Sequence, residues 1–191
     1  GSVSTSGSWD KLKKSEIKPG FTEHLKILSD AGVNLIILEA MTSKDETVET
    51  IIECSSKINL PVWLSISCAM NFNEGKLMHG YQESVTNSKA HFYDYLENSL
   101  LKFTQLHKGP ISVAHSDIKV TGEAVKILKK VHKGPIGAYP NNGYFEKPNW
   151  KLVDDISPSS YLQEAKSWVS NGAQIIGGCC GVGPDKIKAI S

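Results

Sequence analysis

Residues 108–139 read KGPISVAHSDIKVTGEAVKILKKVHKGPIGAY, and this stretch decides the fold class. Pro110–Ala114 is a short apolar run, Gly122–His132 has the apolar spacing of an amphipathic helix, and Pro135–Tyr139 is a second apolar run. The residues Lys-Gly-Pro-Ile lead into both apolar runs. Apolar runs without polar alternation are typical of parallel strands that are covered on both faces. The stretch therefore predicts two successive strand–helix units of an α/β protein.

The same alternation extends along the whole chain of 191 residues. Further strands are predicted at Ser2–Thr5, Asn34–Glu39, Pro61–Ser67 and Ala173–Gly177. Further helices are predicted at Phe21–Asp30, Lys44–Ile58, Ser88–His107, Ser159–Ser170 and from Pro184 onward. The polar segment between Cys68 and Asn87 is predicted to be a loop near a functional site. About six parallel strands fit either an open doubly wound sheet or part of a (β/α)8 barrel, which takes about 250 residues when complete.

Composition and charge exclude several kinds of partner. The chain has 21 lysines, no arginine and 20 acidic residues, so its net charge is +1. This balance argues against nucleic acid or an anionic membrane as a partner. No apolar run approaches the roughly 18 residues of a membrane-spanning helix. Four cysteines in a chain of this size do not form a disulfide scaffold, so we expect a cytoplasmic protein with reduced thiols.

The pair Cys179-Cys180 is the sharpest chemical feature of the sequence. It lies in a glycine-rich turn directly after the predicted strand Ala173–Gly177, and the carboxyl ends of strands carry the functional sites of β/α proteins. Two adjacent thiols on such a turn can both face one soft cation, and zinc prefers cysteine sulfur. The alternative is that two small buried cysteines fill space beside glycines.

A catalytic zinc site needs a third protein ligand from another strand end. His115 follows the run Ile111–Ala114 and is the first candidate, and Cys68 is its competitor. A histidine in this position can equally be a hydrogen-bonded structural residue. Cys54 lies within a predicted helix and is expected in the core.

Glu39 ends another predicted strand, Asn34–Glu39. A carboxylate after a largely apolar run would be an unpaired buried charge unless it has a partner. It is therefore either a functional acid or a structural carboxylate that accepts backbone N–H groups. The segment 139–143, Tyr-Pro-Asn-Asn-Gly, has the composition of an ordinary turn.

Several of these segments together resemble the homocysteine S-methyltransferase family. The similarity is strongest from Tyr139-Pro140-Asn141-Asn142-Gly143 through Trp150 and Trp168 to Ile175–Gly181, followed by Gly183-Pro184 and Ile187. Upstream, Ala31–Asn34 leading to Leu38-Glu39 resembles the family's fourth strand, and Val62–Ser65 resembles its fifth. The resemblance implies a (β/α)8 TIM-barrel fold of which this chain has about six parallel strands, the third to the eighth.

The resemblance also implies the chemistry. The family binds zinc through three cysteines and uses it to activate the thiol of homocysteine, which receives a methyl group from a small-molecule donor and becomes methionine. Cys179 and Cys180 match two of the zinc ligands. Glu39 matches a residue that helps to hold the ammonium group of the amino acid, and Asn141 lies in the loop after strand seven, close to the site.

Two features depart from the family pattern. Where the family's sixth strand ends in Asn-Cys, this chain has Ala114-His115, so His115 would have to replace a cysteine ligand. The first two strands have no counterpart, so we expect residues 1–191 to be a single partial barrel domain, either a fragment or a shortened relative. A second copy of the chain could cover the open sheet edges as a homo-oligomer. Two alternatives remain for the function of the chain. It is a zinc-binding barrel remnant that acts as a binding or assembly module, or it is an unrelated open α/β binding protein.

Overall fold

A parallel sheet forms the framework of the molecule. The computed structural model describes residues 12–82, 90–146, 149–152 and 156–191. The largest sheet has five parallel strands in the order β1 (Ile36–Met41), β2 (Val62–Ile66), β6 (Ile111–Asp117), β7 (Ile136–Asn141) and β10 (Ile175–Ile176). Their order in space follows their order in the chain, as in a (β/α)8 barrel, whereas a doubly wound sheet reverses its order. Five predicted strands are therefore confirmed, and Ser2–Thr5 lies outside the described residues.

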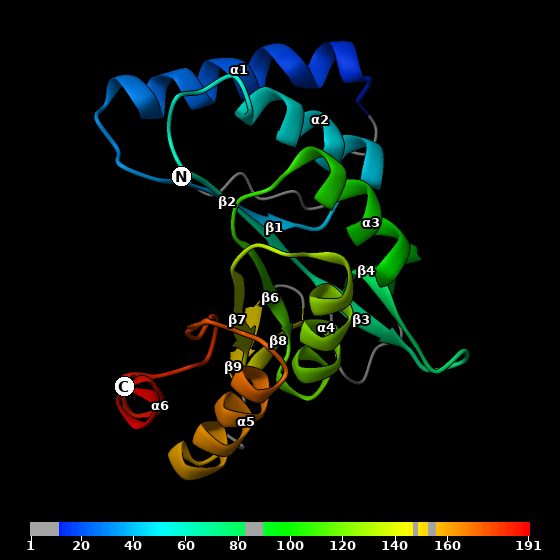
Figure 1. Cartoon of the computed structure of the whole chain (residues 1–191). Coiled ribbons are helices and arrows are strands. Elements are labelled where there is room, and N and C mark those ends of the chain that lie inside the picture. The colour runs from blue at the N-terminus through cyan, green and yellow to red at the C-terminus, as the bar shows by residue number, and fades with distance from the viewer. Residues whose placement is uncertain (1–11, 83–89, 147–148, 153–155) are drawn as a thin grey trace.

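Helices follow one another around the outside of this sheet (Figure 1). Each packs against the next along the chain, which gives a continuous outer layer. They are α1 (Lys14–Asp30), α2 (Asp45–Ser55), α3 (Leu96–Leu106), α4 (Ile118–Val131), α5 (Pro158–Ser170) and α6 (Pro184–Ile190). None of these helices is long and apolar enough to cross a membrane.

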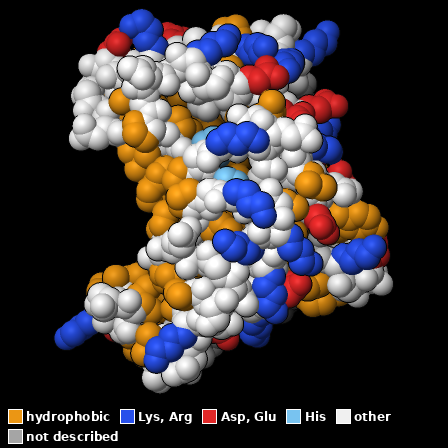
Figure 2. All heavy atoms as spheres, viewed as in Figure 1, with side chains coloured by type: hydrophobic (Ala, Val, Ile, Leu, Met, Phe, Trp, Pro, Cys, Tyr) orange, Lys and Arg blue, Asp and Glu red, His pale blue; other side chains and the backbone are white. Residues whose placement is uncertain are grey.

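The two faces of the parallel sheet differ in character. Strand residues that face the helices are apolar and buried, and they include Ile36, Leu38, Leu64, Ile66, Ile111, Val113, Ile136 and Ala138. On the other face the register aligns Ser65 with Ser112 and Ser112 with Gly137, while Ile37 is 42% exposed. Figure 2 shows hydrophobic side chains in a hollow on the side of the molecule away from α3. The inner face of the sheet is thus the less filled one, and polar side chains can meet there.

The prediction of a loop between Cys68 and Asn87 is wrong. This region begins an antiparallel sheet of β3 (Cys68–Asn71), β4 (Lys76–Gln82) and β5 (Ala90–Tyr95). The start of the predicted helix at Ser88 is also wrong, because residues 90–95 are a strand and α3 begins at Leu96. The physical reason lies in residues 90–95, AHFYDY, whose three aromatic residues favour a strand.

Two smaller features complete the fold. The first helix begins at Lys14 and not at Phe21, with Pro19 inside it, because the Lys13 N–H donates to the Glu16 carboxylate at 2.8 Å and starts the helix earlier. A second hairpin, β8 (Gly143–Glu146) and β9 (Asn149–Leu152), follows β7.

The repeated motif at the amino ends of β6 and β7 buries two histidines. His107 and His132 each follow a helix directly, and their rings fold back over Gly109 and Gly134. The pKa of both imidazoles is lowered, and burial is the main cause. In the unfolded chain these two histidines have a pKa of about 6.5, so below that pH they bind more protons in the unfolded state than in the folded state.

The contribution of His107 and His132 to stability should therefore fall as the pH drops below about 6.5, by at most about 1.4 kcal/mol per pH unit for each residue. Urea unfolding between pH 7.5 and 5.5 (about the range in which histidine titrates) measures this slope. The double variant His107→Gln/His132→Gln should lose the part of the slope that these two residues cause, and so should depend less on pH than the unchanged chain. An unchanged slope in the double variant would show that these two residues do not cause it.

Candidate functional site

Glu39 joins three strands at the carboxyl end of the sheet. Its Oε1 accepts a hydrogen bond from Ser65 Oγ of β2 at 3.0 Å, and its Oε2 accepts one from Tyr139 OH of β7 at 3.0 Å. The backbone N–H of Ala40 also donates to Oε1 at 3.2 Å. Both alternatives for Glu39 thus have support, since it accepts a backbone N–H and also lies among side chains at the inner face.

A β-bulge presents Glu39 to this face. The register of β1 against β2 shifts between Leu38 and Met41, and Ala40 lies in the left-handed region with φ +50°. Bulges beside active sites commonly redirect a side chain. A non-glycine residue at positive φ is strained, and such strain concentrates at functional sites. The bulge and the strained Ala40 therefore set the direction of the Glu39 side chain.

Cys179 and Cys180 lie in the turn between β10 and α6, and the end of β7 holds this turn in place. The Cys179 N–H donates to Pro140 O at 2.9 Å, and the Asn142 N–H donates to Cys180 O at 2.7 Å. Asn141 adds a side-chain contact, because its Oδ1 accepts the Cys180 N–H at 3.2 Å. The predicted loop residue Asn141 thus directly contacts this turn, residues 177–183, which we call the thiol turn.

The electrostatic setting of the thiols favours a cation. Burial, and then the neighbouring Cys180, raise the pKa of the Cys179 thiol to about 11, and the Glu39 carboxylate adds to the effect. Burial also raises the pKa of Tyr139, which therefore remains a protonated donor to Glu39. A positive charge between the thiols would reverse the penalty on the thiolates.

The thiol pair fits zinc as two ligands. The two sulfur atoms lie 3.9 Å apart, and ligands at the Zn–S distance of about 2.3 Å with tetrahedral angles are separated by about 3.8 Å. Within the described ranges, however, no three His, Cys, Asp or Glu side chains are close enough together to hold a metal ion. The structure supplies two of the predicted ligands as a pair and does not gather the third.

His115, the predicted third ligand, lies beside Asn141, which itself contacts Cys180. Its Nδ1 lies 3.5 Å from Asn141 Nδ2, and its backbone has φ +49° at a second bulge, between Ala114 and Asp117. The competing candidate, Cys68, is buried in β3, and burial raises the pKa of its thiol to about 12. Ligation by His115 stays a prediction. Cys54 is buried in the core, as expected.

Sequence reasoning missed three residues of this site. Ser65 and Tyr139 hold Glu39, and Tyr161 of α5 donates to Gly177 O at 2.6 Å, just before the thiol turn. Two of them had a detectable signal, since Ser65 and Tyr139 lie at the carboxyl ends of predicted strands. Tyr161 had none, because a buried tyrosine in an amphipathic helix is typical of a core.

The fold and the site together define a β/α-barrel type of protein with a carboxylate and a thiol pair at the same end of its sheet. The chain belongs to the homocysteine S-methyltransferase family, whose family model matches residues 1–191. It is 27% identical over 188 residues to homocysteine S-methyltransferase 2 of Zea mays, covering 93% of this chain and 49% of that protein. It is 25% identical to the selenocysteine methyltransferase of Astragalus bisulcatus, covering 95% of this chain and 50% of that protein.

Solved structures agree on the fold. The apo form of the homocysteine methyltransferase MmuM from Escherichia coli superposes with a TM-score of 0.63 at 18% identity, covering 94% of this chain and 57% of that one. Its metallated form gives a TM-score of 0.62 at 16% identity, with coverage of 97% and 55%. The chain thus spans about half the length of the relatives it matches.

Proposed function

We propose that this chain carries the homocysteine- and zinc-binding part of a methyltransferase that makes methionine from homocysteine, as a single partial barrel domain. The observation that carries the proposal is the placement of Glu39 and the thiol pair at one end of the sheet, joined through Tyr139 and the end of β7. The substrates would be two small molecules, homocysteine and a methyl donor.

Cys179 and Cys180 would hold the zinc, with His115 as the predicted third ligand. When bound, zinc would favour the thiolate form of homocysteine, which is the nucleophilic form. Asn141 would keep the thiol turn against β7 through its bond to the Cys180 N–H. The chain thus needs no histidine as a general base in this proposal.

Glu39 would bind the ammonium group of homocysteine. Its carboxylate is held from two sides by hydroxyl donors, so it has a fixed orientation before the ligand arrives. Such preorganisation lowers the entropic cost of binding. The distance between ammonium and thiol would then decide which amino acids place their sulfur at the thiol pair.

The test is homocysteine binding to the zinc-loaded chain by calorimetry at neutral pH. Glu39→Gln should weaken binding about 10- to 100-fold, because a hydrogen-bonded charge is lost. Glu53→Gln is the matched control, since Glu53 is a surface carboxylate of α2 that pairs with Lys14 and Lys18. Equal affinity in Glu39→Gln and in the unchanged chain would contradict the role of Glu39.

One observation favours a second function. Because the described residues gather no three-ligand group, the chain could be a zinc-binding remnant without catalysis that acts as a binding or assembly module. β1 and β10 are the end strands of the described sheet, and a second copy could pair with them. Stoichiometric zinc without turnover of homocysteine and a sulfonium methyl donor would support this alternative.

A further inference from the structure

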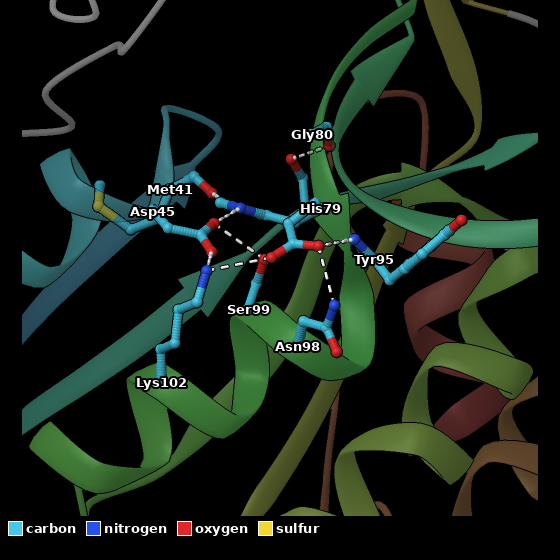
Figure 3. A network of polar contacts seen from close by, with 10 residues as sticks. Met41, Asp45, His79, Gly80, Tyr95, Asn98, Ser99 and Lys102 are labelled. Carbon is cyan, nitrogen blue, oxygen red and sulfur yellow. Dashed lines mark hydrogen bonds and ion pairs between the residues drawn. The ribbon is translucent and has the colours of Figure 1, made fainter.

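A polar network lies where the antiparallel sheet meets α2 and α3 (Figure 3). His79 of β4 is fully buried at its centre. Its Nδ1 lies 2.9 Å from Asp45 Oδ1, and its Nε2 lies 2.9 Å from the backbone oxygen of Met41. Ser99 Oγ donates to Asp45 Oδ1 at 2.8 Å, and Lys102 Nζ donates to Asp45 Oδ2 at 2.7 Å.

The hydrogen-bond partners determine how many protons the His79 ring carries. A backbone carbonyl only accepts, so Nε2 must carry a hydrogen. An ionised carboxylate also only accepts, so Nδ1 must carry one as well. Burial alone would raise the pKa of Asp45, but the bonds from His79 and Lys102 outweigh burial and lower it to about 2. Ser99 and the Lys102 ammonium donate to the same carboxylate, as they would to an ionised Asp45. With an ionised Asp45 on one side and the Met41 carbonyl on the other, the geometry makes both ring nitrogens of His79 donors, so the ring is doubly protonated.

The surrounding charges balance this buried cation. Lys102 bridges Asp45 to Asp94 of β5 at 3.1 Å, which gives two positive and two negative groups in one network. Among its other neighbours, the rings of Tyr93 and Phe103 pack against the imidazole at 5.6 and 5.3 Å between centroids, and Cys68 of β3 is its partner in the strand register. Buried ions persist when they are paired in this way.

The combination of Ser99, His79 and Asp45 is not a nucleophilic triad. In a triad the serine donates to one ring nitrogen and the carboxylate accepts from the other. Here Ser99 donates to the carboxylate, and Met41 O occupies the second ring nitrogen. The ring is also fully buried, so no substrate reaches it. The network must act through the groups it holds.

Met41 is the link from this network to the candidate site. It is the last residue of β1 and lies two residues after Glu39, beyond the strained Ala40. We propose that His79 is a positioning residue for Glu39: the doubly protonated ring holds the Met41 carbonyl, and so maintains the bulge that presents the Glu39 carboxylate to the inner face. The consequence for homocysteine binding rests on the function proposed above.

Two variants separate this role from a general loss of structure. His79→Phe retains a ring but removes both hydrogen bonds. Asp45→Asn allows a singly protonated ring to keep both contacts, since the amide N–H can donate to Nδ1 while Nε2–H still donates to Met41 O. His91→Phe is the matched control, because His91 is an exposed histidine of the same antiparallel sheet.

Nitrogen-15 NMR of the histidine rings at neutral pH tests the protonation directly. In the unchanged chain both nitrogens of His79 should carry hydrogen, and in Asp45→Asn only one should. A singly protonated His79 in the unchanged chain would overturn the inference. This measurement needs neither zinc nor homocysteine, so it stands apart from the proposed function.

Amide hydrogen exchange tests the positioning. His79→Phe should speed exchange at Ala40 and Met41 at least tenfold, while Gly137 and Ala138 of β7 keep their protection. In Asp45→Asn and His91→Phe, the exchange rates at Ala40 and Met41 should stay close to those of the unchanged chain. Exchange at residues 40–41 that His79→Phe does not alter would overturn the proposal.

Homocysteine affinity provides the functional readout. His79→Phe should lower it at least fivefold, Asp45→Asn should retain it, and equal affinity in His79→Phe and the unchanged chain would overturn the positioning role. If the unchanged chain binds no homocysteine while exchange at residues 40–41 responds as expected, the proposed function fails and the structural link from His79 to β1 stands.

Discussion

The double variant Cys179→Ser/Cys180→Ser should bind zinc more than about 100-fold more weakly. Removing a residue that only hydrogen-bonds to a metal ligand already costs about 10- to 100-fold in metal affinity, and here two ligands themselves are lost. A serine hydroxyl stays protonated at neutral pH and is a poor ligand for a borderline-soft cation. The sulfur atoms, 3.9 Å apart, have the separation of two ligands on one zinc ion. Competition with a coloured chelator measures the affinity.

Cys54→Ser is the matched control for this prediction. Cys54 is buried in α2, where its Sγ lies 3.9 Å from Lys18 O. Its replacement shows whether the loss of a thiol elsewhere in the chain affects zinc binding as the loss of Cys179 and Cys180 does. We expect Cys54→Ser to bind zinc as the unchanged chain does. Equal affinity in the double serine variant would remove the metal assignment. His115→Ala in the same assay decides whether His115 is the third ligand, since an unaltered affinity would exclude it.

Gly181→Ala should disrupt the thiol turn. Gly181 has φ +78°, and a Cβ at this position would lie only 1.9 Å from the Asn142 carbonyl oxygen. That oxygen belongs to the residue whose N–H bonds Cys180 O, so the clash would push the turn away from β7. The left-handed conformation alone costs an alanine about 1–2 kcal/mol, and the clash adds to it.

Gly32→Ala is the control for the backbone cost. Gly32 has φ +81°, and nothing lies within 4 Å of its hypothetical Cβ. Both variants should lose unfolding free energy, but only Gly181→Ala should also lose zinc affinity. If the two variants bind zinc equally, the attachment of the thiol turn to β7 does not shape the metal site.

The parallel sheet could be predicted from the sequence because each strand there is a short apolar run between helices. The antiparallel sheet could not, because β3 (CAMN) continues the apolar run of β2 after a single residue, and β4 (KLMHGYQ) contains no such run. The predicted helix Ser88–His107 included the residues of β5, because β5 ends directly before α3 and helical periodicity extends across both. The aromatic residues of β5 favour a strand, whereas periodicity across residues 88–107 favours a helix, so the two local signals conflict there.

In the candidate site, too, some features could be predicted from the sequence and others could not. Glu39 and the thiol pair could be placed at one end of the sheet because they follow predicted strands. The orientation of His115 could not, because it depends on a left-handed backbone at a bulge, which no local pattern of residues indicates. The role of Tyr139 depends on a contact with Glu39 that spans 100 residues.

The most direct measurement is the zinc X-ray absorption spectrum of the metal-loaded chain before and after homocysteine is added. We expect two sulfur ligands at about 2.3 Å, from Cys179 and Cys180, in the absence of homocysteine. Addition of homocysteine should raise the number of sulfur ligands to three, because its thiolate joins the same zinc. A zinc site without sulfur, or a sulfur count that homocysteine does not change, would contradict the account.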